Sequence, residues 1–383
     1  MALTLQIVPQ DLTPAYNQQK FVAISDQIGV SDFKYIVTIE VNASGTIFTE
    51  TIYAAPDGTM TFDAKEYVMN YIEHYFNPNI SLLSPCELAT NKTVSVEVKI
   101  KEYYTAAIQS TTTTNYEAFD ACLSNEDFDN YDVADYIATG TLNYSGLTDT
   151  TVTPDNRIDL TSDLWLHFIN DVANPITNIV LQNRSSIGTV IQTITIAAIP
   201  SSTLNYPTYV VNVTPRMFTA PVVGGSVRIQ CKNAATTNII DTSFTLTDIC
   251  TNYTDYKLYY LDRTGNVLFF NFELVSQENV NKSTNTVRLA TSSVNSWERE
   301  KHVVSTQLTK QITLTSNWIT ETQSTQLNNL FDSPIVWLYL NEVYTPITIT
   351  DTNYKLNKHA NEPLFNYVVN CEYGLTNSRQ RGI

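Results

Sequence analysis

The chain has 383 residues, of which 43% are hydrophobic and only 16% charged, and its 11 Gly and 14 Pro exclude collagen-like and Gly/Pro-rich low-complexity classes. Asp and Glu (38) outnumber Lys and Arg (22), so the net charge is −16, a poor match to DNA or to an anionic membrane surface. The sequence contains no apolar run of the 18 or more residues that a membrane span needs.

The first block, residues 1–105, is predicted to be a small β-sandwich with one helix. Strands are expected at residues 3–8, 21–25, 33–41, 47–53 and 94–103, and apolar and polar residues alternate within 35–41 and 94–101. Pro56-Asp57-Gly58 predicts a turn. A helix is expected to begin at an Asp63 N-cap and to end at residues 77–79. One face of that helix would carry Val68, Tyr71, Ile72 and Tyr75.

The second block, residues 106–250, opens with Ser110-Thr-Thr-Thr-Thr114, whose composition indicates a flexible polar linker. An acidic stretch follows, and then a series of short strands suggests a second sandwich. These strands are expected at residues 138–143, 164–169, 179–182, 190–198, 208–213 and 226–231.

The third block, residues 251–383, begins with a hairpin signal. Strands at residues 256–261 and 267–272 flank a turn that ends in Gly265. Further strands are expected at 303–315, 335–340, 347–350 and 365–373, with a tight turn at Asn341-Glu342. Thr320–Gln323 forms a capping box before a short helix that contains Leu327, Leu330 and Phe331. The whole chain is therefore predicted to be mainly β, with two to three β-sandwich domains of immunoglobulin or fibronectin type and a few short helices.

The residue types that carry catalysis or metal binding show no recognised spacing. The four histidines are scattered, so we interpret them as structural or surface residues, and we expect no metal and no cofactor. The five cysteines are odd in number and far apart, and the first basic residue is Lys20. We therefore expect free thiols, no secretory signal peptide and no Cys231–Cys250 disulfide.

The acidic stretch of residues 120–135 and the four tryptophans are the remaining candidates for interaction. Asp127, Asp129 and Asp132 loosely follow a calcium loop but lack its Gly and its final Glu, so a solvated loop is the main interpretation and a weak Ca²⁺ or Mg²⁺ site the alternative. Trp318 precedes the capped helix, and Trp337 lies within a strand. Each could pack in a core or anchor an interface.

A succession of motifs in the third block resembles the C-terminal part of structural tail proteins from tailed phages of Bacteroidetes, including crAss-like phages. The motifs are NYTDYKLYYLDRTGN (252–266), STQLTK (305–310), TSNWITE (315–321), LFDSP (330–334), VWLY (336–339), PITITDTNYK (346–355) and FNY (365–367). The first block adds a weaker similarity to tail-associated proteins through LTPAYN (12–17), FKY (33–35), PDG (56–58) and FD (62–63). The middle block shows no such resemblance.

The resemblance implies a non-enzymatic virion component that is made in the bacterial cytoplasm and forms a ring or connector around the tail axis. Its expected partners are identical subunits and neighbouring tail or portal-side proteins, without sequence-specific nucleic acid binding and without a membrane. A distal adhesin that binds a receptor or glycan is one alternative, and a glycan-degrading enzyme with converging carboxylates is a weaker one.

The C-terminal residues 377–383 are polar and basic. One interpretation is a solvated tail. The other is a docking strap in which Arg379 and Arg381 bind carboxylates of an adjacent subunit, such as those of residues 120–135. The second interpretation predicts that removal of residues 377–383 leaves the monomer folded but impairs assembly.

Overall fold

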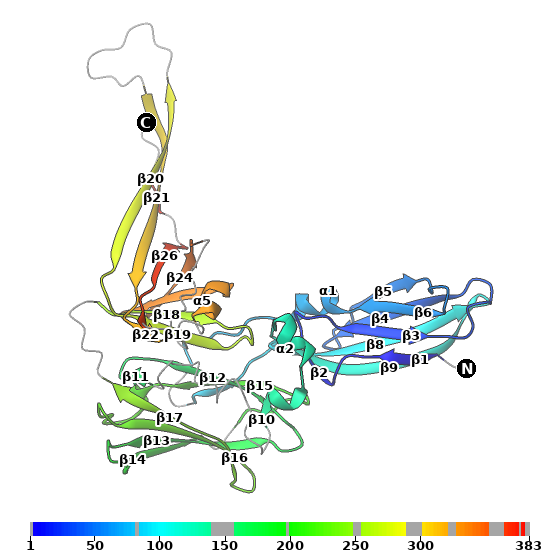
Figure 1. Ribbon diagram of the computed structural model, residues 1–383, viewed down its shortest axis with the longest axis horizontal. Coiled ribbons are helices and arrows are strands. Elements are labelled where there is room, and N and C mark those ends of the chain that lie inside the picture. The colour runs from blue at the N-terminus through cyan, green and yellow to red at the C-terminus, as the bar shows by residue number, and fades with distance from the viewer. Residues whose placement is uncertain are drawn as a thin grey trace. The chain divides into compact units, whose positions relative to one another are not determined.

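The computed structural model describes residues 3–80, 84–138, 157–196, 199–247, 254–288, 301–320, 327–351, 364–374 and 377–379. Strands account for 54% of the chain and helices for 8%, which confirms the predicted mainly-β class with a few short helices (Figure 1). The chain divides into two compact units. The first contains Met1–Asp248 and Arg263–Val267, and the second contains Ile249–Asp262 and Leu268–Ile383.

The N-terminal part of the first unit is a sandwich of two sheets with the strand orders β2-β9-β8-β4-β5 and β1-β3-β6. The strands are β1 (Thr4–Ile7), β2 (Leu12–Pro14), β3 (Lys20–Ile24), β4 (Lys34–Val41), β5 (Ile47–Ile52), β6 (Thr59–Asp63), β8 (Thr93–Tyr104) and β9 (Ala107–Phe119). Alternate residues of β4 and β8 are buried, and they share one core with Phe21, Met60 and Phe62 of the smaller sheet. The period-2 pattern in the sequence therefore gave the correct buried face.

The predicted helix of the first block is much shorter than expected. It consists of α1 (Lys65–Val68) and the 3-10 helix η1 (Met69–Tyr71), and Ile72 is already extended. Asp63 is not the N-cap, because Ala64 occupies that position. Instead, one carboxylate oxygen of Asp63 accepts hydrogen bonds from the N–H groups of Gln19 (2.9 Å) and Lys65 (3.0 Å). Asp63 thus ties the start of α1 to the segment before β3.

The predicted linker at residues 110–114 is wrong, because these residues lie within strand β9 and pair in antiparallel register with β8. Threonine is β-branched and fits a pleated, half-exposed surface, so a threonine run can extend a strand as readily as a loop. The boundary proposed between residues 105 and 106 falls in the turn of this hairpin, where Thr105 and Ala106 both have positive φ.

A second pair of sheets completes the first unit, with the orders β10-β12-β15-β7 and β11-β17-β16-β13-β14. The strands are β7 (Cys86–Leu88), β10 (Ile137–Ala138), β11 (Arg157–Asp159), β12 (Leu164–Asn170), β13 (Ile176–Arg184), β14 (Val190–Ile196), β15 (Thr208–Val213), β16 (Ser226–Asn233) and β17 (Asn238–Thr247). All residues of β12 and β15 are buried, whereas β13 alternates. Most predicted strands of this block are present, and the part of the first one after Ala138 lies outside the described residues.

Short elements join the two sandwiches of the first unit. Strand β7 precedes β8 in the chain but pairs with β15, and β2 pairs in parallel with the end of β9. A small core connects the same regions through Leu12, Phe119, Leu123 and Ile169. The helices α2 (Asn125–Asp129), η2 (Val133–Asp135) and η3 (Pro215–Met217) also belong to this unit.

The second unit is built on one large sheet with the order β19-β18-β23-β24-β26-β21-β20, to which β27 adds by pairing with β21. The elements of the unit are β18 (Tyr256–Leu261), β19 (Val267–Phe272), β20 (Gln277–Arg288), β21 (Lys301–Thr315), β22 (Ile319–Thr320), α5 (Asn328–Asp332), β23 (Val336–Leu340), β24 (Val343–Ile349), β25 (Leu364–Phe365), β26 (Val368–Tyr373) and β27 (Asn377–Arg379). Strands β18 and β19 match their predicted bounds. The last predicted strand is interrupted between β25 and β26, and residues 321–326, with most of the predicted capping box, lie outside the described part.

Three predicted turns are confirmed by backbone geometry. Gly58 and Gly265 have φ of 83° and 69°, and Asn341 and Glu342 both have positive φ at the β23–β24 turn. A Cβ atom at Gly58 would lie 2.3 Å from the carbonyl oxygen of Ser25, so this turn needs glycine for space as well as for φ.

Candidate functional site

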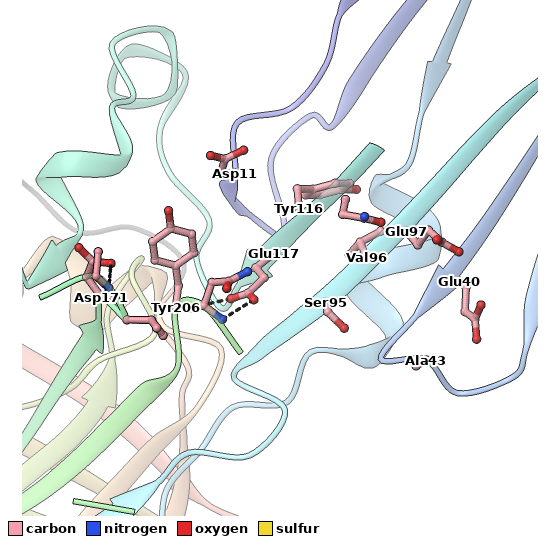
Figure 2. Close-up of a pocket in the computed structure, with 14 residues that line it drawn as sticks. Asp11, Glu40, Ala43, Ser95, Val96, Glu97, Tyr116, Glu117, Asp171 and Tyr206 are labelled. Atoms are coloured by element: carbon pink, nitrogen blue, oxygen red, sulfur yellow. Dashed lines mark hydrogen bonds between the residues drawn. The ribbon is translucent and has the colours of Figure 1, made fainter. Parts of the chain in front are cut away.

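A cleft of about 770 Å³ in the first unit opens beside β8 and β9 (Figure 2). Its acidic lining residues come from five separate segments: Asp11, Glu40, Glu97, Glu117 and Asp171. None of the fourteen lining residues is basic, although Lys99 pairs with Glu97 from the same strand. A cleft lined in this way favours a positively charged group.

Glu117 is the most buried acidic residue of the cleft, and its role is structural. Its two carboxylate oxygens accept hydrogen bonds from the backbone N–H groups of Asn205 (2.7 Å) and Tyr206 (2.8 Å) (Figure 2). Burial raises the pKa of Glu117, and the two N–H donors counteract that rise. Glu117 therefore fastens the segment before β15 to strand β9.

Other acidic side chains of the cleft also support the backbone beside them. Asp171 accepts a hydrogen bond from the N–H of Ala173 (2.9 Å), and Glu40 accepts one from the N–H of Gly45 (3.1 Å). Burial, with the nearby carboxylates of Asp11 and Asp171, raises the pKa of Tyr206. The hydroxyl at the cleft therefore stays protonated at neutral pH, and the cleft offers charge and hydrogen-bond acceptors.

A buried polar cluster lies elsewhere in the first unit. The ammonium of Lys92, which is 2% exposed, donates to Nδ1 of His167 (2.8 Å) and to the carbonyl oxygen of Gly265. Burial, followed by the Lys92 charge, lowers the pKa of His167 well below its ordinary value, so this histidine is neutral. His74 contacts the carboxylate of buried Asp120 at 3.0 Å. Both histidines therefore contact a charged side chain within the first unit.

The acidic stretch contains one buried residue and several exposed residues in or beside two short helices. Asp120 is 1% exposed, so the expectation that the whole stretch could face a partner is wrong for this residue. Asp127 and Asp129 are exposed in α2, where the N-cap Ser124 accepts from the N–H of Asp127 (3.1 Å). Asp132 caps η2 by accepting from the N–H of Ala134 (3.0 Å). Within the described part of the chain, no group of three or more His, Cys, Asp or Glu side chains could hold a metal ion.

The two tryptophans chosen as interface candidates differ in exposure. Trp318 is 64% exposed between β21 and β22, which places it outside the core and leaves it accessible to a partner. Trp337 is half-buried in β23, where it lies opposite Tyr259 and Pro346 of the neighbouring strands. Trp337 therefore contributes to the sheet of the second unit.

The C-terminal candidates are only partly described. Asn377–Arg379 forms strand β27 and pairs with Thr306–Leu308 of β21, so the backbone there is not a free tail. Arg381 lies outside the described residues. Removal of residues 377–383 would therefore remove a paired strand together with the last basic residues.

Strands β20 and β21 form a long hairpin arm, which the sequence patterns predicted only in part (Figure 1). On its other edge β21 pairs with β26 at residues 311–315 and with β27 at residues 306–308, so β20 is the outer strand. Residues 277–287 of β20 are all exposed, so neither face of this strand is covered. The register between the strands is supported by polar cross-strand bonds, from Asn281 to Gln311 (2.7 Å) and from Asn285 to Ser305 (3.1 Å).

Free thiols are observed at the described cysteines Cys86, Cys122, Cys231 and Cys371, and Cys250 lies outside the described residues. Burial raises the pKa of Cys86 and of Cys371 to about 12. Among the described helices, none has the length and apolar character required to cross a bilayer. Comparison of the sequence with protein-family models and with curated proteins found no match.

Proposed function

We propose that the protein is a non-enzymatic structural component of a bacteriophage tail that assembles through contacts between identical subunits into a ring or connector. The observation that carries this proposal is the β20–β21 arm, whose outer strand is exposed throughout residues 277–287. Because residues 277–287 are exposed, β20 is held mainly by its pairing with β21. An arm of this kind gains stability when another surface covers it.

Two further features support a role in assembly. Trp318 on the second unit is 64% exposed, and large aromatic side chains are enriched at protein interfaces. The motifs of the second unit that resemble phage tail proteins include the residues of β18, residues 305–310 of β21 and residues 336–339 of β23. The net charge of −16 suits a ring that surrounds DNA without holding it.

Mass photometry and negative-stain electron microscopy of the purified chain test the proposal. We expect one dominant oligomer with closed rotational symmetry, because heterologous contacts between identical subunits close into rings when the rotation permits. A chain that stays monomeric at micromolar concentration, and that is also absent from purified virions by mass spectrometry, would contradict the proposal.

A further inference from the structure

The arm has two chemically different faces, which follow from the strand register. Val280 lies opposite Lys310, and Lys282 lies opposite Leu308. Residues opposite each other, and residues two apart, share one face of a ribbon, so Lys282 and Lys310 are on the same face with Val280 between them. Val280 is 58% exposed, and both lysines are exposed. Glu278 lies on this face too, two residues before Val280 and opposite Ile312, and Leu308 lies opposite Lys282. We call Val280, Lys282 and Lys310 the basic face.

The other face of the arm carries uncharged residues, and some of their side chains are hydrogen-bonded across the two strands. It carries Asn281 and Asn285, whose amides donate across the ribbon to β21. These bonds hold the ribbon in register before any partner binds. The basic face is therefore presented by a preformed strand pair, which lowers the entropic cost of docking.

Charge is distributed unevenly between the arm and the first unit. The first unit contains 26 acidic and 12 basic residues, a net charge of −14, whereas the second contains 12 acidic and 10 basic residues. Strands β20 and β21 contain four basic residues and one acidic residue, Glu278, a net charge of +3. Each copy of the chain thus carries a basic arm and an acidic first unit.

We propose that the basic face of the arm docks on the acidic first unit of a second copy of this chain. This inference rests on the proposed function and names the contact that would produce it. The complementary charges are the reason to choose a second copy as the partner, because every copy brings both surfaces. Such a contact joins different surfaces of two copies, so it is heterologous and can propagate around a ring.

We expect side chains of the arm to make this contact, rather than backbone pairing of β20 with a further strand. β20 is an edge strand of its sheet, and an edge lysine such as Lys282 discourages a further strand from pairing there. The 12 residues of β20 span about 40 Å at roughly 3.3 Å per residue, enough to cross a large part of a neighbouring domain. Contacts between exposed charges weaken with salt, so docking by the arm should be strongest at low ionic strength.

Charge reversal on the arm tests the inference. The variant Lys282→Glu/Lys310→Glu should weaken self-association at least tenfold by mass photometry at low salt, with unchanged circular dichroism and thermal melting. The matched control is Lys101→Glu/Lys232→Glu, which changes the net charge by the same amount on the half-exposed surface of the first unit. The control should assemble at least as well as the unmodified chain. Equal assembly of the arm variant and the control would overturn the inference.

Zero-length coupling of amines to carboxylates identifies the contact directly. In oligomers mixed from ¹⁴N- and ¹⁵N-labelled copies, we expect Lys282 and Lys310 to cross-link to carboxylates of the first unit in peptides of mixed label. Cross-links confined to one copy would overturn the inference. The inference would also be wrong if a fluorescent DNA duplex bound to Lys282 and Lys310 while replacement of both lysines by Glu left assembly unchanged.

The two proposals fail in different ways. If the unmodified chain does not self-associate and is absent from virions, both the proposed function and the arm contact are wrong. If it forms rings that the arm variant forms equally well, only the arm contact is wrong.

Discussion

Two long hairpins of similar composition differ in how far their residues are buried. The β8–β9 pair and the β20–β21 pair are both antiparallel and rich in Thr and polar residues. In β8, alternate residues from Val94 to Ile100 are buried in the core of the first sandwich. In β20, residues 277–287 are all exposed. A regular apolar residue at every second position is what separates a core strand from a projecting arm.

The difference also predicts which region contributes most to folding stability and which contributes most to assembly. The first unit gains its stability from two sandwiches with shared cores and from buried polar groups that have partners. Strand β20 has cross-strand bonds but no buried residue from 277 to 287, so substitutions there should affect contacts between copies more than folding.

The largest expected effect comes from the same substitution in the two hairpins. Val98→Ala should lower the free energy of unfolding by about 2–3 kcal/mol, because Val98 is 1% exposed and its truncation leaves a cavity. Val280→Ala should change it by less than about 0.5 kcal/mol, because Val280 is 58% exposed. Urea denaturation of both variants measures the difference, and similar losses would show that the arm is part of a folded core.

Lys92→Met tests the buried polar cluster. It leaves Nδ1 of His167 and the carbonyl of Gly265 without the Lys92 donor, which should cost about 1–3 kcal/mol. Lys101→Met on the half-exposed face of β8 is the control and should cost less than about 0.5 kcal/mol. If urea denaturation finds the two variants equally stable, the Lys92 contacts are not important for folding.

The neutral His167 should make the first unit sensitive to mild acid. Its pKa is lowered in the folded state, so the unfolded chain binds the proton more readily and stability falls as pH drops below the unfolded value of about 6.5. The loss should approach about 1.4 kcal/mol per pH unit at most. His167→Asn keeps an acceptor for Lys92 but does not titrate. We expect a flatter dependence of stability between pH 7 and 5 for this variant, whereas an unchanged slope would assign the pH sensitivity to other groups.

The smallest effect concerns the exposed acidic segment. Ser124→Ala removes the N-cap of α2 and should cost about 0.5–1 kcal/mol, whereas Ser124→Thr should retain the cap. Hydrogen exchange at the amide of Asp127 reports the change locally. Equal protection in both variants would mean that the Ser124 hydroxyl does not hold this helix.

Sequence patterns predicted the strands that have one or two buried faces. The alternation at β8 and the apolar runs of β18 and β19 gave nearly correct bounds. Strand β20 was missed because it has no buried face and therefore no apolar period. The Thr run of residues 110–114 was misread for a related reason, since pairing with β8 and not composition makes it a strand.

The interaction surfaces could be predicted only in part. The exposure of Trp318 and the capping role of Asp132 depend on local structure that a single sequence only suggests. The acidic cleft combines residues as distant as Asp11 and Asp171, so only the tertiary fold brings them together. The basic face needs the β20–β21 register, which shows that Lys282 and Lys310 share a side of the ribbon.

Cryo-electron microscopy of the assembled particle tests the central claim most directly. We expect the β20–β21 arm of each copy to lie on the first unit of its neighbour, with Lys282 and Lys310 within reach of that unit's carboxylates. Density that shows the arm free in solvent, or bound only within its own chain, would contradict the account.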